Sequence, residues 1–239
     1  MAQYDIDALL ERLLALSDPE YAAFNARLVP CDVASTLGVR TPALRSIARE
    51  ILRNEDWRAF LDASRAHPLH DLRMLHAFVL GGARCGIDEK LARIEAFLPC
   101  MDNWEVCDGL CSSFKPRANE QEAAFAYCLA CADAEEEFRK RFGLVMLMSR
   151  FADPPFAEGT LRAYRRFRHD GYYARMGAAW GLATLWLHQR DGALAILQEG
   201  LWDDFTHNKA IQKLCESYRV SDEDKALARS LRRGRAKRT

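Results

Sequence analysis

The chain lacks the features that mark membrane and exported proteins. No apolar stretch among its 239 residues approaches the roughly 18–20 residues that a membrane-spanning helix needs. The first residues, MAQYDIDALLERLL, are acidic and amphipathic, without the charged start and apolar run of a secretory signal. We therefore expect a soluble, cytoplasmic protein with no membrane partner.

Signals for β-strands are missing as well. The sequence shows no alternation of apolar and polar residues and no hairpin dipeptide between strand-like runs. Apolar residues instead recur every three to four positions, for example over residues 6–16, 44–52, 91–98 and 142–151. This period predicts an all-α protein.

Breaks between the helical segments are short. Asp18 and Pro19 have the types expected of an N-cap and the first helical residue. No segment has the composition of a long flexible linker, so we expect a dozen or so paired helices in one domain over residues 1–228. Three glycines are expected at helix ends: Gly171, Gly192 and Gly200.

The eight cysteines lack the spacing of a zinc site. They lie within apolar, helix-like segments, which favours reduced thiols in a core. Cys128 and Cys131 form a C-x-x-C motif, but the Ala-rich segment around them offers no knuckle turn, and the six histidines supply no partner spacing. We expect these cysteines to pack rather than bind metal.

The net charge of the chain is zero, but its charged residues are unevenly distributed. The chain has 34 Lys and Arg against 34 Asp and Glu. The segment 229–239 holds six of the basic residues and no acid, which leaves 28 against 34, a net of −6, in the rest. This basic C-terminal tail could bind phosphate or could be a solvated chain end.

A repeat of 34 residues is present in the sequence. The segments DLRMLHAF, EVCDGLCS, RKRFGLVM, YARMGAAW and HNKAIQKL align in a constant frame. One column of this alignment is mostly basic and consists of Arg73, Cys107, Arg141, Arg175 and Lys209. Three positions earlier lies a mostly aromatic column of His70, Trp104, Phe138, Tyr172 and Thr206.

A period of this length with paired helices is typical of an α-solenoid. Residues at one repeat position would then line up along a curved inner surface. The basic column would form a stripe there that tracks a phosphate backbone, with salt-dependent binding. The same residues could instead be the polar edges of their helices, with side-chain stems packed on apolar neighbours.

One repeat interrupts the basic column with an acid. In NWEVCDGLC, Trp104 and Asp108 are four residues apart and share one face of a helix that is predicted to start at Asp102 or Asn103. A carboxylate near phosphates is electrostatically unfavourable, so it is retained for packing or because a reaction needs negative charge. Gly109 lowers helix propensity and serves either close approach or looser packing.

The chain resembles the DNA alkylation repair family of HEAT-like-repeat DNA glycosylases, the AlkD-like proteins. The resemblance covers essentially the full length. It is carried by GVRTPALRSIARE (38–50), DNWEVCDGLC (102–111), FRKRFGLVMLM (138–148), YYARMGAAWGL (172–182) and DDFTHNKAIQKLCESYRV (203–220). The resemblance implies an α-solenoid of HEAT-like repeats, curved, with a concave DNA-binding face.

The resemblance also implies an activity and its residues. Such proteins hydrolyse the N-glycosidic bond of cationic N3- and N7-alkylated purines in double-stranded DNA. The catalytic aspartate of the family falls on Asp108, its two pocket tryptophans on Trp104 and Trp180, and its arginine on Arg141. Relatives without the aspartate lack base excision, so Asp108 is the discriminating residue. Without the resemblance, Trp180 would be assigned to the core.

The chemistry suits these residue types. An alkylated purine is already cationic, so its departure needs no general acid, and one carboxylate suffices where sugar hydrolases use two. Asp108 would stabilise the oxocarbenium-like sugar and activate water, while the tryptophans offer aromatic faces to the cation. No metal or organic cofactor is required. Arg141 would hold a phosphate near the lesion, and the remaining backbone contacts would come from Arg40, Arg45, Arg73, Arg175 and Lys209.

Other functions compatible with the sequence are non-catalytic. A helical-repeat module that binds DNA structures or a protein partner would fit the balanced charge, whereas an RNA-associated role has no aromatic signature to support it. Intact Asp108 favours the monofunctional glycosylase. A solenoid with capped ends is expected to be a monomer.

Overall fold

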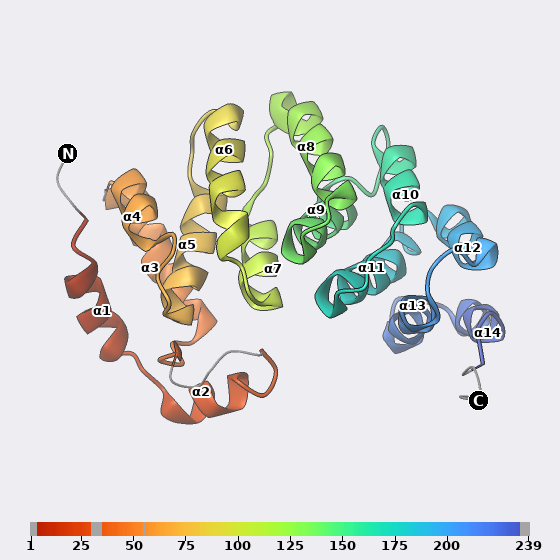
Figure 1. Ribbon diagram of the computed structural model, residues 1–239, viewed down its shortest axis with the longest axis horizontal. Helices are drawn as coiled ribbons and strands as arrows, with labels where there is room; N and C mark the ends of the chain where they lie inside the picture. The colour runs from red at the N-terminus through yellow and green to blue at the C-terminus, as the bar shows by residue number, and fades with distance from the viewer. Residues whose placement is uncertain (1–3, 30–34, 55, 235–239) are drawn as a thin grey trace. The chain divides into compact units, whose positions relative to one another are not determined.

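The computed structural model describes residues 4–29, 35–54 and 56–234. Throughout these residues the chain is helical and contains no strand, which confirms the predicted all-α class (Figure 1). The chain divides into two compact units, residues 1–120 and 121–239, which we describe separately. The single domain expected over residues 1–228 stays a prediction. Cys31 and three cations of the basic tail, Arg235, Lys237 and Arg238, lie outside the described residues.

The first unit packs three helices in series. Helix α5 lies between α3 and α7, while α4 packs on α3 and α5, and α6 packs on α5. The bounds are α1 Ile6–Leu14, α2 Pro19–Asn25, α3 Thr41–Asn54, α4 Trp57–Ser64, α5 His70–Gly82, α6 Ile87–Phe97 and α7 Trp104–Ser113, with short 3₁₀ turns η2 Leu98–Cys100 and η3 Ala118–Glu120.

The second unit repeats this arrangement. Helix α11 lies between α9 and α13, while α8, α10 and α12 form a second layer against α9 and α11, and α14 packs on α13. The bounds are α8 Gln121–Asp133, α9 Glu137–Arg150, α10 Ala157–Arg165, α11 Tyr172–Leu185, α12 Arg190–Glu199, α13 Asp204–Glu216 and α14 Asp222–Ser230. Two-layer stacking of successive helix pairs is the organisation of a helical-repeat solenoid.

The 34-residue frame coincides with the starts of the odd-numbered helices. Helices α5, α7 and α11 begin at His70, Trp104 and Tyr172, the residues of the mostly aromatic column. Helix α9 begins one residue before Phe138, and α13 begins two residues before Thr206. Each residue of the basic column therefore lies in the first turns of a helix in the same layer of its unit.

Glycines in the same frame allow helices to approach closely. Gly109, Gly143 and Gly177 each lie two residues after a member of the basic column. A Cβ at Gly143 would lie 2.4 Å from the backbone nitrogen of Ala132 in α8, and one at Gly177 would lie 3.3 Å from Cγ of Arg141 in α9. These contacts set the spacing between α9 and its two neighbours.

One predicted helix end is wrong. Gly200 does end α12 in the left-handed conformation, with φ of 65°, and Gly171 caps the start of α11. Gly192, by contrast, lies in the first turn of α12, where a Cβ would be 2.4 Å from Cδ1 of Leu161 in α10. This glycine serves the contact between α10 and α12.

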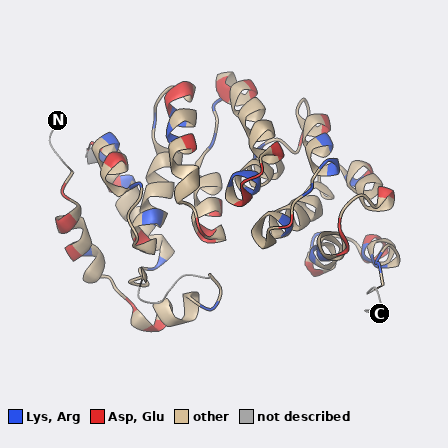
Figure 2. Ribbon diagram, viewed as in Figure 1, with Lys and Arg blue, Asp and Glu red and all other residues tan. Residues whose placement is uncertain are grey.

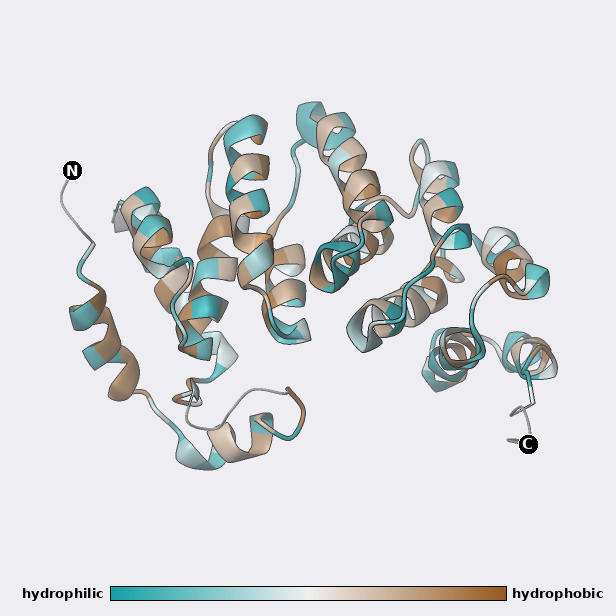
Figure 3. Ribbon diagram, in the orientation of Figure 1, coloured by the Kyte–Doolittle hydropathy of each residue, from teal (hydrophilic) through white to brown (hydrophobic). Residues whose placement is uncertain are grey.

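Each unit has an apolar core between its helices. Fully buried side chains include Phe60, Leu72 and Phe97 in the first unit, and Phe142 and Tyr164 in the second. Hydrophobic and hydrophilic residues share the same helices, as the period of the sequence requires (Figure 3). No helix in the described part of the chain has both the length and the apolarity that crossing a membrane would demand.

Candidate functional site

The candidate catalytic pair lies on α7 of the first unit. Asn103 is the N-cap: its Oδ1 accepts hydrogen bonds from the backbone nitrogens of Glu105 at 3.0 Å and Val106 at 3.1 Å. The helix therefore begins at Trp104 with Asn103 as its cap, so of the two predicted starting residues, Asp102 and Asn103, the structure selects Asn103. Asp108 follows one turn later, and both side chains are half-buried. The spacing of four residues brings the indole and the carboxylate to one face of α7.

The indole of Trp104 is anchored to a distant part of the chain. Its Nε1 donates a hydrogen bond to the carbonyl oxygen of Leu28, 3.1 Å away, just beyond the end of α2. Because this donor is engaged, the ring has only its aromatic face and edge to offer a ligand.

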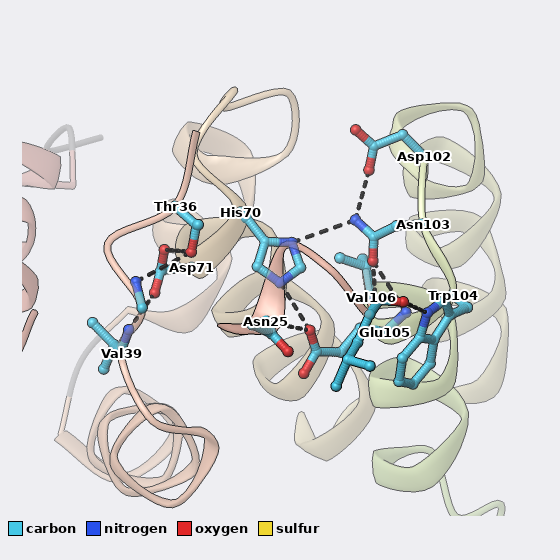
Figure 4. A network of polar contacts seen from close by, with 12 residues as sticks. Asn25, Thr36, Val39, His70, Asp71, Asp102, Asn103, Trp104, Glu105 and Val106 are labelled. Atoms are coloured by element: carbon cyan, nitrogen blue, oxygen red, sulfur yellow. Dashed lines mark hydrogen bonds and ion pairs between the residues drawn. The ribbon is translucent and has the colours of Figure 1, made fainter. Parts of the chain in front are cut away.

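The residue after Trp104 belongs to a buried polar network, drawn in Figure 4. Oε2 of Glu105 accepts from Nδ2 of Asn25 at 3.0 Å and lies 3.1 Å from Nε2 of His70. Burial opposes ionisation of Glu105, but the hydrogen bonds from His70 and then Asn25 outweigh it, so the pKa of Glu105 lies below its ordinary value. Glu105 therefore carries a negative charge at neutral pH within the first unit.

Contacts with α5 explain why a glycine follows Asp108 at position 109. A Cβ at this position would lie 3.1 Å from Cε1 of Phe78 and 3.6 Å from Cε of Met74, both on α5. Of the two explanations open for this glycine, the structure supports close approach, since α7 packs tightly on α5 behind Asp108.

The predicted DNA-binding cations of the first unit are engaged with other residues. Arg40 donates to Oδ2 of Asp18 through Nη2 at 2.8 Å. Arg45 donates to Oγ of Ser112 at 2.9 Å, and burial is the main cause that lowers its pKa. Arg73 pairs with Asp102 and donates to the carbonyl oxygen of Pro68 at 2.6 Å.

In the second unit, Arg141 is the most buried of the predicted residues. Its side chain is 5% exposed, and its Nη1 donates to the carbonyl oxygen of Tyr173 at 2.8 Å. Trp180 lies on α11 and is 39% exposed, so it is not a core residue of that unit. The structure places Arg141 and Trp180 on neighbouring helices, α9 and α11.

The last two cations of the basic column, Arg175 and Lys209, lie close to one aromatic ring. The guanidinium of Arg175 lies 4.6 Å from the ring centre of Phe205, and the ammonium of Lys209 lies 5.9 Å from it. Arg175 also lies 3.7 Å from Oδ1 of Asp203, and Lys209 donates to Oε1 of Gln212 at 3.0 Å. Three members of the basic column thus reach forward to the start of the next helix in their layer, namely Arg73, Arg141 and Arg175.

Sequence reasoning missed a group of cations in the first unit. Arg49 and Arg53 follow Arg45 at intervals of four residues on α3, and all three share one face of the helix. A hollow lined by Arg49, Arg53, Trp57 and Arg84 lies next to them. The spacing of the three arginines was a signal in the sequence. Elsewhere acids and bases are interspersed within each unit (Figure 2).

Of the seven cysteines that the structure describes, four are buried as expected, whereas Cys85, Cys100 and Cys215 are partly exposed. Cys107, Cys111, Cys128 and Cys131 are buried, and burial raises the pKa of the Cys128 thiol. Over the described ranges, no three His, Cys, Asp or Glu side chains are grouped so as to hold a metal ion.

Helix pairs that repeat at about 34 residues and stack in two layers define a helical-repeat protein of the solenoid class. Residues 9–199 match the family model described as DNA alkylation repair enzyme, so the chain belongs to this family. It is an enzyme in the repair of alkylated DNA, and DNA is its substrate. Among curated proteins, none matches the chain.

Proposed function

We propose that the protein is a monofunctional DNA glycosylase that hydrolyses the N-glycosidic bond of cationic N3- and N7-alkylated purines in double-stranded DNA. The observation that carries the proposal is the half-buried Asp108 one turn after Trp104 on α7, in a chain of the DNA alkylation repair enzyme family. An aromatic face beside a carboxylate suits a cationic base attached to a sugar that becomes cationic.

The reaction needs little from the protein beyond charge and position. The alkylated purine takes the electron pair of its bond to C1′ and leaves as a neutral base. Asp108 stabilises the positive charge that develops on the deoxyribose. It also orients the attacking water and accepts its proton, so the products are the free base and an abasic site.

The residues of the second unit have supporting roles in this proposal. Trp180, exposed on α11, offers another aromatic face to the cation, which contributes about 0.5–2 kcal/mol. Arg141 holds a phosphate near the lesion, a role that suits its planar guanidinium.

Base release from methylated duplex DNA tests the proposal. Wild-type protein is expected to release 3-methyladenine and 7-methylguanine, and Asp108→Asn to lose most of this activity. Asp88→Asn is the matched control, because Asp88 is an exposed acid in the first turn of α6. Absence of release from every cationic lesion by the wild-type protein would refute the glycosylase assignment.

A non-catalytic DNA- or protein-binding module is the second candidate. The ion pairs of Arg73 with Asp102 and of Arg175 with Asp203 favour the protein-binding form, because they leave less positive charge in the basic column for phosphates. Neither duplex binding nor base release in the same assay would support that form, whereas tight duplex binding without release would support the DNA-binding form.

A further inference from the structure

Helix α2 is fixed at both of its ends to parts of the first unit that are distant in sequence. At its carboxyl end, Asn25 contacts Glu105 across 80 residues, and the carbonyl of Leu28 contacts Trp104 across 76. Both contacts therefore reach the first two residues of α7. Hydrogen bonds from one short helix and its following turn to two successive residues of another helix fix the position of those residues closely.

At its amino end, α2 packs on the segment before α3. The backbone nitrogen of Asp18 donates to the carbonyl oxygen of Leu37 at 3.0 Å. Gly38 has φ of 72°, and a Cβ there would lie 2.3 Å from the carbonyl oxygen of Asp18 and 2.7 Å from the backbone nitrogen of Ala22. Only glycine permits this approach, so the start of α2 is closely fitted.

The first two residues of α5 hold both of these contacts in place. Asp71, 1% exposed, accepts from the backbone nitrogens of Leu37 at 2.7 Å and Val39 at 2.9 Å. His70, 4% exposed, lies against Glu105. Figure 4 shows His70 and Asp71 directed to opposite sides, one toward α7 and the other toward the segment before α3.

The hydrogen bonds also fix the form of His70. Oδ1 of Asn103 is used in capping α7, so its Nδ2 faces Nδ1 of His70 at 3.3 Å as a donor. In this arrangement Nδ1 of His70 accepts and Nε2 donates to Glu105. Three successive residues, Asn103 to Glu105, are thereby held by partners outside α7.

We propose that α2 and the turn after it, residues 19–29, form a brace that sets the orientation of the Trp104 indole. Asn25 and Glu105 are its positioning residues. They act through Trp104 and do not touch substrate. The brace fixes the plane of the ring beside Asp108, so a cationic base meets a face that is already aligned. This inference rests on the proposed function for its catalytic effect, but the geometry it claims does not require activity.

Fluorine NMR of the full-length protein labelled with 5-fluorotryptophan tests the brace directly. The chain has five tryptophans, and the signal of residue 104 is assigned with Trp104→Phe. Asn25→Ala is expected to shift or broaden this signal and leave the other four in place. Glu105→Gln, which keeps the shape and an acceptor oxygen, is expected to cause a smaller change of the same kind.

Single-turnover excision provides the second measurement. Asn25→Ala is expected to lower the excision rate at saturating DNA about tenfold, with the Kd for DNA within about twofold of wild type. Ser64→Ala is the matched control, because it removes a buried hydrogen bond with His76, 2.9 Å long, in the same unit but outside the network around Trp104. It should alter neither the signal nor the rate.

The outcomes separate the brace from the proposed activity. An unchanged signal of residue 104 in both Asn25→Ala and Glu105→Gln overturns the brace, as does a rate loss no larger than that of Ser64→Ala. If the wild-type protein excises nothing, the glycosylase proposal fails, while the NMR measurement still decides whether the brace exists. If Asn25→Ala does not fold, Glu105→Gln decides alone, since it preserves volume and hydrogen-bonding shape.

Discussion

His76 is buried and Glu105 is half-buried, and their surroundings favour a neutral histidine and an ionised carboxylate. Glu105 keeps its negative charge because His70 and Asn25 donate to it. His76 is 2% exposed, lies 2.9 Å from Oγ of Ser64 and stacks on Phe97 with ring centres 4.0 Å apart. Burial is the main cause that lowers the pKa of His76 to about 3, so the ring stays neutral in the folded protein.

The neutral His76 makes stability depend on pH. In the unfolded chain this histidine takes up a proton below its ordinary pKa of 6.5, whereas the folded protein does not until about pH 3. The contribution of neutral His76 to the free energy of unfolding is therefore complete above pH 6.5 and decreases as the pH falls. The decrease is about 2 kcal/mol between pH 7 and pH 5. Urea unfolding at both pH values measures the loss, which His76→Gln should largely remove. Parallel pH curves for the two proteins would contradict the prediction.

At the scale of helices, the glycines of the 34-residue frame determine how closely neighbours pack. Gly143 faces backbone atoms of α8, which can move only if the helix moves. We expect Gly143→Ala to destabilise the protein by about 1–3 kcal/mol, because overpacking outweighs the gain in helix propensity. Gly86→Ala is the control, since nothing lies within 4 Å of a Cβ there. Equal urea midpoints for the two variants would show that α8 adjusts without cost.

The sequence predicts the helices better than the contacts between them. The apolar period predicts the helices, and the 34-residue frame coincides with the starts of α5, α7 and α11, because each repeat must present the same face to its neighbours. The in-helix position of Gly192 was missed because its reason is Leu161 on another helix. Nothing in the frame relates Asn25 to Glu105, so the contact between α2 and α7 could not be read from the sequence.

The candidate site shows the same division. Helical spacing was enough to place Trp104 and Asp108 on one face of α7, and residue type narrowed the N-cap to Asp102 or Asn103, of which the structure selects Asn103. The burial of Arg141 could not be predicted. An arginine at a repeat position is expected to be a surface cation, and only the structure shows that Gly177 on the next helix leaves room for its side chain. The catalytic roles of all four residues stay predictions.

At the scale of the whole molecule, charge governs the encounter with DNA. Each cation that contacts a phosphate releases counterions, so its removal lowers the dependence of log K on log salt by about 0.9. We expect Arg45→Ala and Lys209→Ala each to weaken duplex binding and reduce this slope. Arg65→Ala, an exposed arginine with no expected role, is the control for loss of charge alone. Unchanged binding at low salt would remove the tested residue from the interface.

The basic tail has to be tested in two parts. Arg233 is held on α13 and on the segment before it: its backbone nitrogen donates to Oδ1 of Asn208 at 3.0 Å, and its Nη1 donates to the carbonyl oxygen of Trp202 at 2.7 Å. Deletion of 235–239 is expected to lower the salt slope of DNA binding without a change in urea midpoint. Deletion of 229–239 should lower the midpoint as well. A salt slope unaffected by the shorter deletion would make this end a solvated terminus.

The hydrogen bond between Trp104 and Leu28 has a consequence for selectivity. An indole with its N–H already engaged reads neither the pattern of donors and acceptors on a base nor the length of an alkyl group. It responds to positive charge and to flat area. The proposed glycosylase would therefore excise adducts that differ in structure but carry a positive charge. It would not excise ordinary bases, because they are uncharged.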